Sequence, residues 1–260
     1  MKQIDSRDNP GYKALKALAA DAREQRRQGR ALLDGVHLLQ AYRDKCGPPL
    51  RLIVSEHGMT QPEVRALRES LVDVECWLLR DKLFAALSEL ASPSGILALI
   101  EIPQAADDGS APQTSCVLLD GIQDVGNVGS ILRTAAAAGI RDVFLGSGCA
   151  GAWTPRVLRA AQGAHFDLRI RESADLAAVM QRFTGIRIAA SAHGAQPLFE
   201  LDLRAPLAWL FGSEGQGISP ALERLADQRA IIPLAAGSES LNVAAAAAIC
   251  LFEEVRQKRG

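Results

Sequence analysis

Three glycine-rich stretches, each placed directly behind a short apolar run, decide the fold of this 260-residue chain. They are Asp120-Gly121-Ile122-Gln123-Asp124-Val125-Gly126-Asn127-Val128-Gly129, then Gly212-Ser213-Glu214-Gly215-Gln216-Gly217, then Gly237-Ser238-Glu239-Ser240-Leu241-Asn242. The runs in front of them are CVLLDGI, LAWLFG and AIIPL. Short apolar runs that end at such loops are typical of buried parallel strands. Open α/β sheets bind ligands outside the carboxyl ends of their strands, so the three loops predict one common binding site.

Bulk composition places the chain among ordinary globular proteins, with 48% hydrophobic and 23% charged residues. No apolar run reaches the length of a membrane span, and the polar, charged start MKQIDSRDNPGYK is not expected to act as a secretory signal. The five cysteines are scattered without a CxxC pair, which favours reduced core residues of a cytoplasmic protein over a disulfide or zinc framework. The four histidines are dispersed as well, so no metal site is expected.

The distribution of charge is more informative than the formal net charge of −1. Residues 1–51 hold 11 Lys and Arg against 6 Asp and Glu, a net charge of +5. A basic end on a nearly neutral protein has two interpretations, a nucleic-acid-binding surface or a solvated helix face. Charge alone favours the solvated face.

Alternating strand and helix patterns divide the chain into two expected α/β domains. Residues 1–102 form the first, which contains an amphipathic, basic helix over 13–30 that closes at Gly29. Residues 103–114, PQAADDGSAPQT, have no apolar period and are the expected linker. Residues 115–260 repeat the alternation, and they end in an alanine-rich helix.

Taken singly, each loop has an ordinary explanation. Asn127 or the turn before it caps a helix, Glu214 is a turn residue, and Ser240 or Asn242 caps the last helix. Arg133, about a turn and a half into its helix, is an ordinary surface arginine. The first loop lacks the GK[ST] of a Walker loop and does not fit GxGxxG, which disfavours a nucleoside triphosphate or dinucleotide. The joint pattern of three loops is not explained in this way.

The loops also carry longer motifs in a fixed order: NVGSILRT at 127–134, LFGSEGQGI at 210–218, and IPL at 232–234 followed by SLNVA at 240–244. Together they resemble the three motifs of the SpoU (TrmH-like) branch of SPOUT RNA methyltransferases. SRDNP at 6–10, the basic helix and LLDGVHLLQAY at 32–42 are similar to that family's ribosomal-protein-L30e-like RNA-binding domain. The resemblance covers nearly the whole chain, and the three motifs are specific as a set.

The resemblance implies a catalytic α/β domain whose C-terminal segment threads a loop to form a deep trefoil knot, an exception to the rule that chains are unthreaded. It implies S-adenosylmethionine as the cofactor, bent in the knot and held largely by backbone groups that glycines leave accessible. It also implies a homodimer with a site completed across the interface. The residues that match the cofactor-binding positions are Leu210, Phe211, Gly212, Ile232, Leu234, Ser240, Leu241 and Asn242.

The implied reaction is methyl transfer to a ribose 2′-hydroxyl of RNA. The residues that match the catalytic positions are Arg133, Asn127, Glu214, Ser240 and Asn242. Because a guanidinium almost never loses its proton, Arg133 is expected to bind the neighbouring phosphate and to stabilise the developing alkoxide. The base is either water or a transiently activated arginine. Glu214 is expected to orient Arg133 or its loop.

The L30e-like domain favours ribosomal RNA as the substrate over transfer RNA. Basic residues of this domain are then expected to contact RNA phosphates, which position an RNA without specifying its sequence. They are Arg7, Lys13, Lys16, Arg23, Arg26, Arg27 and Arg30. Two alternatives stay open: a transfer-RNA 2′-O-methyltransferase, and a non-catalytic RNA-binding or ribosome-assembly protein on the same fold. An NAD-dependent enzyme would need a GxGxxG turn and a ribose-binding acid downstream, and neither is properly placed.

Overall fold

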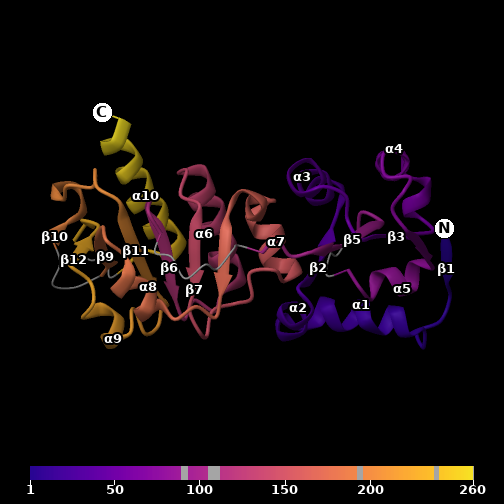
Figure 1. Cartoon of the computed structure of the whole chain (residues 1–260), viewed down its shortest axis with the longest axis horizontal. Helices are drawn as coiled ribbons and strands as arrows, with labels where there is room; N and C mark the ends of the chain where they lie inside the picture. The colour runs from indigo at the N-terminus through magenta and orange to yellow at the C-terminus, as the bar shows by residue number, and fades with distance from the viewer. Residues whose placement is uncertain (89–92, 105–111, 192–195, 237–239, 260) are drawn as a thin grey trace. The chain divides into compact units, whose positions relative to one another are not determined.

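The computed structural model describes residues 1–88, 93–104, 112–191, 196–236 and 240–259 (Figure 1). Most of the expected linker, 105–111, and part of the third loop, 237–239, therefore lie outside the described residues. The chain divides into two compact units, Met1–Pro103 with Trp153–Phe166, and Gln104–Ala152 with Asp167–Gly260. The first unit thus includes a segment that the expected boundary assigns to the second domain.

The first unit is built on a mixed five-stranded sheet with the strand order β1-β4-β3-β5-β2. Its strands are β1 (Lys2–Ile4), β2 (Arg30–Asp34), β3 (Arg51–Ser55), β4 (Cys76–Leu79) and β5 (Ile96–Glu101). Its helices are α1 (Pro10–Ala20), α2 (Ala22–Gln28), α3 (Val36–Cys46), the 3₁₀ turn η1 (Gly58–Thr60), α4 (Pro62–Glu69), α5 (Asp81–Ala85) and α7 (Pro155–Ala161). Helices α1, α2 and α5 lie on one face of the sheet, and α3 and α4 lie on the other (Figure 1).

The basic segment 13–30, expected as one helix, is two helices in the structure, α1 and α2. Asp21 separates them because its backbone is extended and its carboxylate accepts a hydrogen bond from the Arg23 N–H at 2.8 Å, which caps α2. Gly29 ends α2 in the left-handed conformation, as expected. The apolar stripe of α1, Tyr12, Leu15 and Leu18, is buried against the sheet, which leaves the basic residues outside.

The second unit is built on a seven-stranded sheet in which every neighbouring pair is parallel, with the order β10-β12-β9-β11-β6-β7-β8. Its strands are β6 (Cys116–Asp120), β7 (Asp142–Leu145), β8 (Arg169–Glu172), β9 (Ile186–Ala190), β10 (Gln196–Pro197), β11 (Leu207–Gly212) and β12 (Gln228–Ile231). The expected strand AIIPL is therefore shifted, since β12 ends at Ile231. The sheet confirms the mostly parallel α/β fold.

Helices cover both faces of this sheet. They are α6 (Val125–Ala137), α8 (Leu176–Arg182), α9 (Pro220–Glu223) and α10 (Val243–Arg259), with 3₁₀ turns η2 (Ala164–Asp167) at the unit boundary and η3 (Leu198–Glu200). Helices α6 and α10 lie on one face, and α8 and α9 lie on the other (Figure 1). Because side chains alternate along a strand, Leu118 and Leu210 pack towards α8. The neighbouring Trp209 points the other way and donates a hydrogen bond to Glu254 of α10.

A buried polar network fixes α10 to the sheet. The Glu254 carboxylate accepts hydrogen bonds from the Ser115 hydroxyl at 2.5 Å and from the Trp209 indole at 2.6 Å, and it pairs with Lys258 at 2.6 Å. The Glu254 side chain is 3% exposed, so its charge depends on these partners. The indole of Trp209 stacks on Phe211, two residues further along β11. The network therefore connects α10 to the amino-terminal half of β11 and to the residue before β6.

Three of the five cysteines, Cys76, Cys116 and Cys250, are buried in the core as expected, whereas Cys46 is exposed and Cys149 is half-buried. Burial raises the pKa of the Cys250 thiol to about 12. Within the described residues, no group of three or more metal-binding side chains comes together. No helix in the described part of the chain is long and apolar enough to cross a membrane.

Candidate functional site

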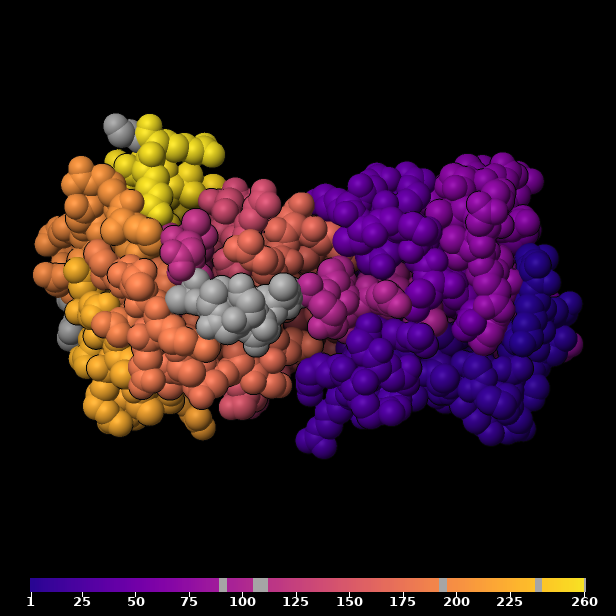
Figure 2. Space-filling view, viewed as in Figure 1, coloured from indigo at the N-terminus to yellow at the C-terminus, as the bar shows by residue number. Residues whose placement is uncertain are grey.

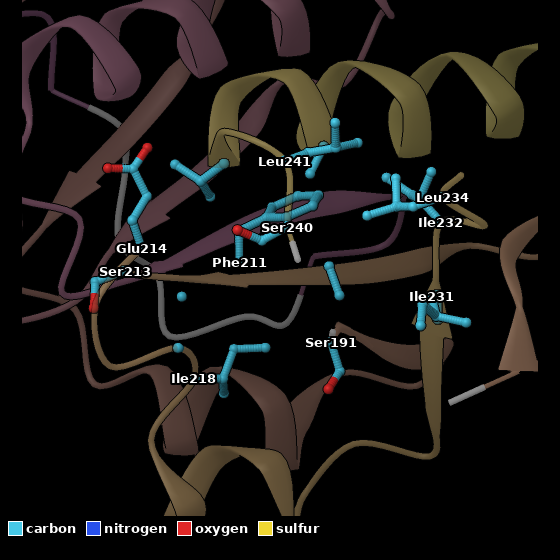
Figure 3. Close-up of a pocket in the computed structure, with 16 residues that line it drawn as sticks. Ser191, Phe211, Ser213, Glu214, Ile218, Ile231, Ile232, Leu234, Ser240 and Leu241 are labelled. Carbon is cyan, nitrogen blue, oxygen red and sulfur yellow. The ribbon is translucent and has the colours of Figure 1, made fainter. Parts of the chain in front are cut away.

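A pocket of about 860 Å³ opens at the carboxyl ends of three parallel strands, β9, β11 and β12. It lies where an open parallel sheet is expected to bind a ligand. Figure 3 shows apolar side chains along much of its length, with Glu214 and Ser213 at one end and Ile231, Ile232 and Leu234 towards the other. The residues that line it are Ala190, Ser191, Phe211, Gly212, Ser213, Glu214, Gly217, Ile218, Ala230, Ile231, Ile232, Leu234, Ser240, Leu241, Val243 and Ala246.

Most of the expected cofactor-binding residues meet in this pocket. Phe211, Gly212, Ile232, Leu234, Ser240 and Leu241 line it. The Leu210 side chain does not, because it is fully buried in the core on the α8 face of the sheet. Asn242 instead joins a group of polar side chains beside the pocket.

That polar group is a hydrogen-bonded triad of Asn127, Glu214 and Asn242, one residue from each of the three loops. Oε1 of Glu214 accepts from Nδ2 of Asn127 at 2.8 Å and from Nδ2 of Asn242 at 2.7 Å. Nδ2 of Asn242 also donates to Oδ1 of Asn127 at 2.9 Å. The triad joins segments 115 residues apart in sequence, and it was expected neither from spacing nor from charge. The observed partners of Glu214 are the two asparagines.

Helix capping holds two members of the triad in place. Asp124, in the turn before Asn127, is the N-cap of α6, and its Oδ1 accepts from the Asn127 N–H at 2.7 Å. Asn242 caps α10, since its Oδ1 accepts from the N–H groups of Ala244 and Ala245. Of the capping alternatives that the sequence leaves open, these two are the ones observed.

Gly212 is needed for a reason other than the expected close approach of a ligand. A Cβ atom placed there would lie 2.2 Å from the carbonyl carbon of Gly217 and 2.3 Å from the Ile218 nitrogen. The loop folds back on itself at this point, with the Gly217 N–H donating to the Ser213 carbonyl at 2.8 Å. Gly217 has a φ of +68°, which favours glycine. A side chain at Gly212 would therefore clash with the backbone of Gly217 and Ile218 and displace the second loop, whether or not a ligand is bound.

Arg133 lies on the surface of α6. Among the described residues it has no hydrogen bond or ion pair, and it does not contact the triad through either. The structure therefore brings Asn127, Glu214 and Asn242 together and places Ser240 in the pocket wall, whereas Arg133 joins the triad through no hydrogen bond or ion pair among the described residues.

The seven basic residues expected to bind RNA are all exposed on the first unit. Residues 1–30, coloured indigo, form part of its surface in the space-filling view (Figure 2). Arg27 pairs with Glu24 and Lys13 pairs with Asp8, so part of this positive charge is already compensated.

Three lining residues lie outside the stretches that the sequence analysis singles out: Ala190, Ser191 and Ala246. Ser191 is the last residue of the run RIAAS at 187–191, which gives a strand end of the same kind as the other three. That run has no glycine-rich loop behind it, so the strongest sequence signal was missing. Ala246 lies on the first turn of α10, where only the packing of the helix decides which side faces the pocket.

A second pocket, polar and wider, lies beside the first and shares Ser213, Glu214 and Gly217 with it. It is formed at the ends of β6, β7 and β11 and at the start of α6. Its lining residues are Asp120, Gly121, Ile122, Gln123, Asp124, Asn127, Ser147, Gly148, Ser213, Glu214, Gly215, Gln216, Gly217, Ser219 and Pro220. The triad residues Asn127 and Glu214 therefore stand at the border of two adjacent pockets.

Residues 114–252, which contain both pockets, match the model of the SpoU rRNA methylase family. The chain belongs to that family. It is 31% identical, over 97% of its length and 98% of the relative's, to the 23S rRNA (guanosine(2553)-2′-O)-methyltransferase RlmP of Bacillus subtilis. It is 32% identical, over 98% of its length and 94% of the relative's, to an uncharacterised tRNA/rRNA methyltransferase of Synechocystis.

Solved structures of SpoU relatives have the same two-domain fold. The SpoU methyltransferase AviRb of Streptomyces viridochromogenes, in complex with AdoMet, superposes with a TM-score of 0.87 at 27% identity, over 96% of this chain and 98% of that one. An AdoMet-bound rRNA methyltransferase of Sinorhizobium meliloti superposes with a TM-score of 0.83 at 25% identity, over 98% and 97%. The expected resemblance to the SpoU family is confirmed.

Proposed function

We propose that this SpoU-family protein transfers a methyl group from S-adenosylmethionine to the 2′-hydroxyl of a guanosine in ribosomal RNA. The observation that carries the proposal is the pair of adjacent pockets with the triad at their border. A methyl transfer needs two substrates held in line, and two pockets with a common wall provide such an arrangement. The full-length similarity to an enzyme named for 23S rRNA guanosine 2′-O-methylation supports the choice of RNA and nucleotide.

The chemistry of the first pocket fits S-adenosylmethionine. Its apolar part, with Ile231, Ile232, Leu234 and Leu241, suits the adenine ring. Its polar end, with Ser213 and Glu214, suits the charged part of the cofactor. The expected cofactor residues Phe211, Gly212 and Ser240 complete these walls. When bound, S-adenosylmethionine supplies the methyl group on a positively charged sulfur.

The protein's own residues position the ribose. In the transfer, the C–S bond to the methyl group breaks and its electron pair stays on sulfur, a C–O bond forms to the 2′-oxygen, and the hydroxyl proton passes to the base, which is water or a transiently activated arginine. Asn127, fixed by Glu214 and by the cap of α6, presents polar groups at the border where the ribose would lie. Asn242, fixed by the same carboxylate, does so from the opposite loop. Holding both asparagines in one geometry removes orientational freedom that the reaction would otherwise have to overcome.

Arg133 acts on the RNA rather than on the cofactor in this proposal. As an exposed guanidinium it binds the phosphate next to the target ribose and offsets the negative charge that develops on the 2′-oxygen. Arg133 makes no hydrogen bond or ion pair with the triad among the described residues, which fits a site that a second copy completes. We therefore include the homodimer in the proposal, with exposed apolar residues such as Phe252 of α10 at the contact.

The order of the parallel strands supports a threaded chain. Strand β11 lies between β6 and β9, although both precede it in sequence, and β12 lies between β9 and β10. A late strand inserted between earlier ones is what the trefoil knot of the family implies. We include the knot, which walls the cofactor pocket with the segment before α10, and we assign the first unit and its exposed basic residues to RNA binding. The compartment we propose is the cytoplasm, in agreement with the buried thiols of Cys116 and Cys250.

Incubation of the protein with radiolabelled S-adenosylmethionine and total RNA tests the proposal. We expect label in ribosomal RNA, and mapping of the modified position should give one 2′-O-methylguanosine. Cofactor binding measured by calorimetry without label in any RNA would favour the non-catalytic RNA-binding alternative. Label in transfer RNA would favour the transfer-RNA alternative.

A further inference from the structure

The polar pocket beside the cofactor pocket contains an unusual set of charges. Three carboxylates, Asp120, Asp124 and Glu214, line it together with the amides of Gln123 and Gln216. No lysine or arginine is among the described residues that line it. A phosphate group would be repelled by these carboxylates, whereas a neutral group that carries N–H donors would be attracted. The pocket is therefore suited to a nucleobase, with the phosphates of the RNA outside it.

All three carboxylates accept hydrogen bonds that hold the loops, but they differ in the acceptor capacity that is left. Asp120, at the end of β6, is half-buried, and its Oδ2 accepts from the Ser219 N–H at 2.8 Å. Glu214 accepts from both asparagines of the triad. Asp124 is exposed. Among the described residues, its carboxylate accepts one hydrogen bond, from the Asn127 N–H to Oδ1. Each carboxylate oxygen has two lone pairs, so Asp124 can still accept hydrogen bonds through both of its oxygens.

A carboxylate with two accepting oxygens distinguishes the four RNA bases. Guanine presents two neighbouring donors, N1–H and the N2 amino group, which one carboxylate can accept side by side. Adenine and cytosine place a ring nitrogen acceptor next to their amino group, and uracil flanks its N–H with two carbonyl oxygens. Those acceptors would face the negative charge unpaired. A side-chain amide next to the carboxylate, as Gln123 offers, supplies a donor for the O6 atom of guanine.

We propose that the polar pocket binds the base of the target nucleotide, that Asp124 selects guanine through its N1–H and N2 amino group, and that Gln123 donates to O6. This inference rests on the proposed function and deepens it, because it names the residues that choose the nucleotide. The shared wall then places the ribose of that nucleotide at Asn127 and Glu214, next to the cofactor pocket. Asp124 is a specificity residue here and takes no part in the chemical step.

Asp124→Asn is a clean test of this role. Asparagine caps a helix about as well as aspartate, so α6 keeps its N-terminus while the pocket loses a negative charge. The amide would also present N–H groups to the amino group of guanine, which opposes binding. Asp175→Asn is the matched control, because Asp175 caps α8 in the same way, through the Ala178 N–H at 3.0 Å, and lines neither pocket.

The measurement uses an RNA fragment that contains the mapped target, prepared with guanosine, inosine or adenosine at that position. Inosine lacks only the N2 amino group of guanosine. For the wild-type protein and for Asp175→Asn we expect kcat/KM to fall about tenfold from guanosine to inosine, and further for adenosine. For Asp124→Asn we expect the ratio of guanosine to inosine to approach one, with unchanged cofactor affinity in calorimetry.

The outcomes separate this inference from the proposed function. If the wild-type protein methylates guanosine and inosine equally well, or if Asp124→Asn keeps the wild-type ratio, the role of Asp124 is wrong while the methyltransferase stands. The same holds if the modified nucleotide maps to a base other than guanine. If no RNA accepts a methyl group from the wild-type protein, the proposed function fails, and the base pocket fails with it.

Discussion

Glu214 and Glu254 each tie β11 and α10 to a third segment of the second unit, but one carboxylate is exposed and the other is buried. Glu214, behind β11, holds Asn127 at the start of α6 and Asn242 at the start of α10. Glu254, far along α10, holds Ser115 just before β6 and Trp209 in β11. The Glu214 network lies at the carboxyl ends of the strands. The Glu254 network joins the amino-terminal half of the strands to α10.

The difference in burial gives the two networks different tasks. Around Glu254 water is excluded, so loss of the carboxylate would leave the Trp209 indole and the Ser115 hydroxyl without an acceptor in the core. Around Glu214 water can replace each partner, so the hydrogen bonds contribute little to stability. They set the direction of two amides instead. We infer that the buried network maintains the fold and that the exposed network orients the site.

The largest expected effect on stability comes from a substitution in the buried Glu254 network. Glu254→Ala should lower the free energy of unfolding by about 3–5 kcal/mol, because it breaks a buried pair and leaves buried donors unpaired. Denaturant titration followed by circular dichroism measures this loss. Asp202→Ala is the control and should cost much less, since it breaks an ion pair between two well exposed side chains. Equal losses for the two variants would show that burial does not explain the comparison.

Arg133→Ala should affect the reaction and spare the fold. We expect kcat to fall about 10²–10³-fold, the usual cost of removing one group that stabilises developing charge. Stability and cofactor affinity should stay unchanged, because Arg133 is exposed and lines neither pocket. Arg141→Ala, an exposed arginine beyond the end of α6, is the matched control for loss of charge. Normal turnover in Arg133→Ala would remove this residue from the mechanism.

Glu214→Gln tests the role of the exposed network. The neutral amide accepts more weakly and can turn its own N–H groups towards the two asparagines, so their orientation is no longer fixed. We expect kcat/KM to fall about ten- to a hundredfold through kcat, while the free energy of unfolding changes by less than about 1 kcal/mol. Single-turnover kinetics and denaturant titration on one preparation measure both. A loss of stability as large as that of Glu254→Ala would contradict the division of tasks.

The ion pair of Arg187 and Asp227 is half-exposed, so its burial lies between that of the Glu254 network and that of the Glu214 network. Asp227 accepts from the N–H and the guanidinium of Arg187, and these hydrogen bonds lower the pKa of Asp227. A carboxyl whose pKa is lowered by folding stabilises the protein above its unfolded pKa, about 3.9, and loses that contribution as the pH falls through the lower folded value. Asp227→Asn should therefore cost at most about 1 kcal/mol at pH 7, because solvent screens the pair.

That difference should shrink below pH 4, and thermal unfolding at pH 7 and at pH 3 measures it. Asp73→Asn is the control, since Asp73 is exposed and forms no ion pair among the described residues, and no change is expected at either pH. A wild-type advantage from Asp227 that grows on acidification would contradict the sign of the effect.

The sequence predicted the elements well where one physical signal dominated. Apolar runs followed by glycine located β6 and β11, and helical spacing with a terminal Gly29 located the basic helical segment. It failed where two signals competed. Asp21 interrupts that segment because its side chain prefers to cap a new helix. The strand expected at AIIPL begins two residues earlier, at Gln228, and its last paired residue is Ile231, opposite Pro197 of β10.

By itself, the sequence determined that three loops at strand ends build one site, since buried parallel strands bring their carboxyl ends to one edge. It also supplied the glycines and most of the pocket residues. Only the tertiary structure decided that Glu214 meets Asn127 and Asn242, that Gly212 serves its own loop, and that two pockets share a wall. Local spacing cannot fix such contacts, because they depend on how strands far apart in the chain are ordered in the sheet.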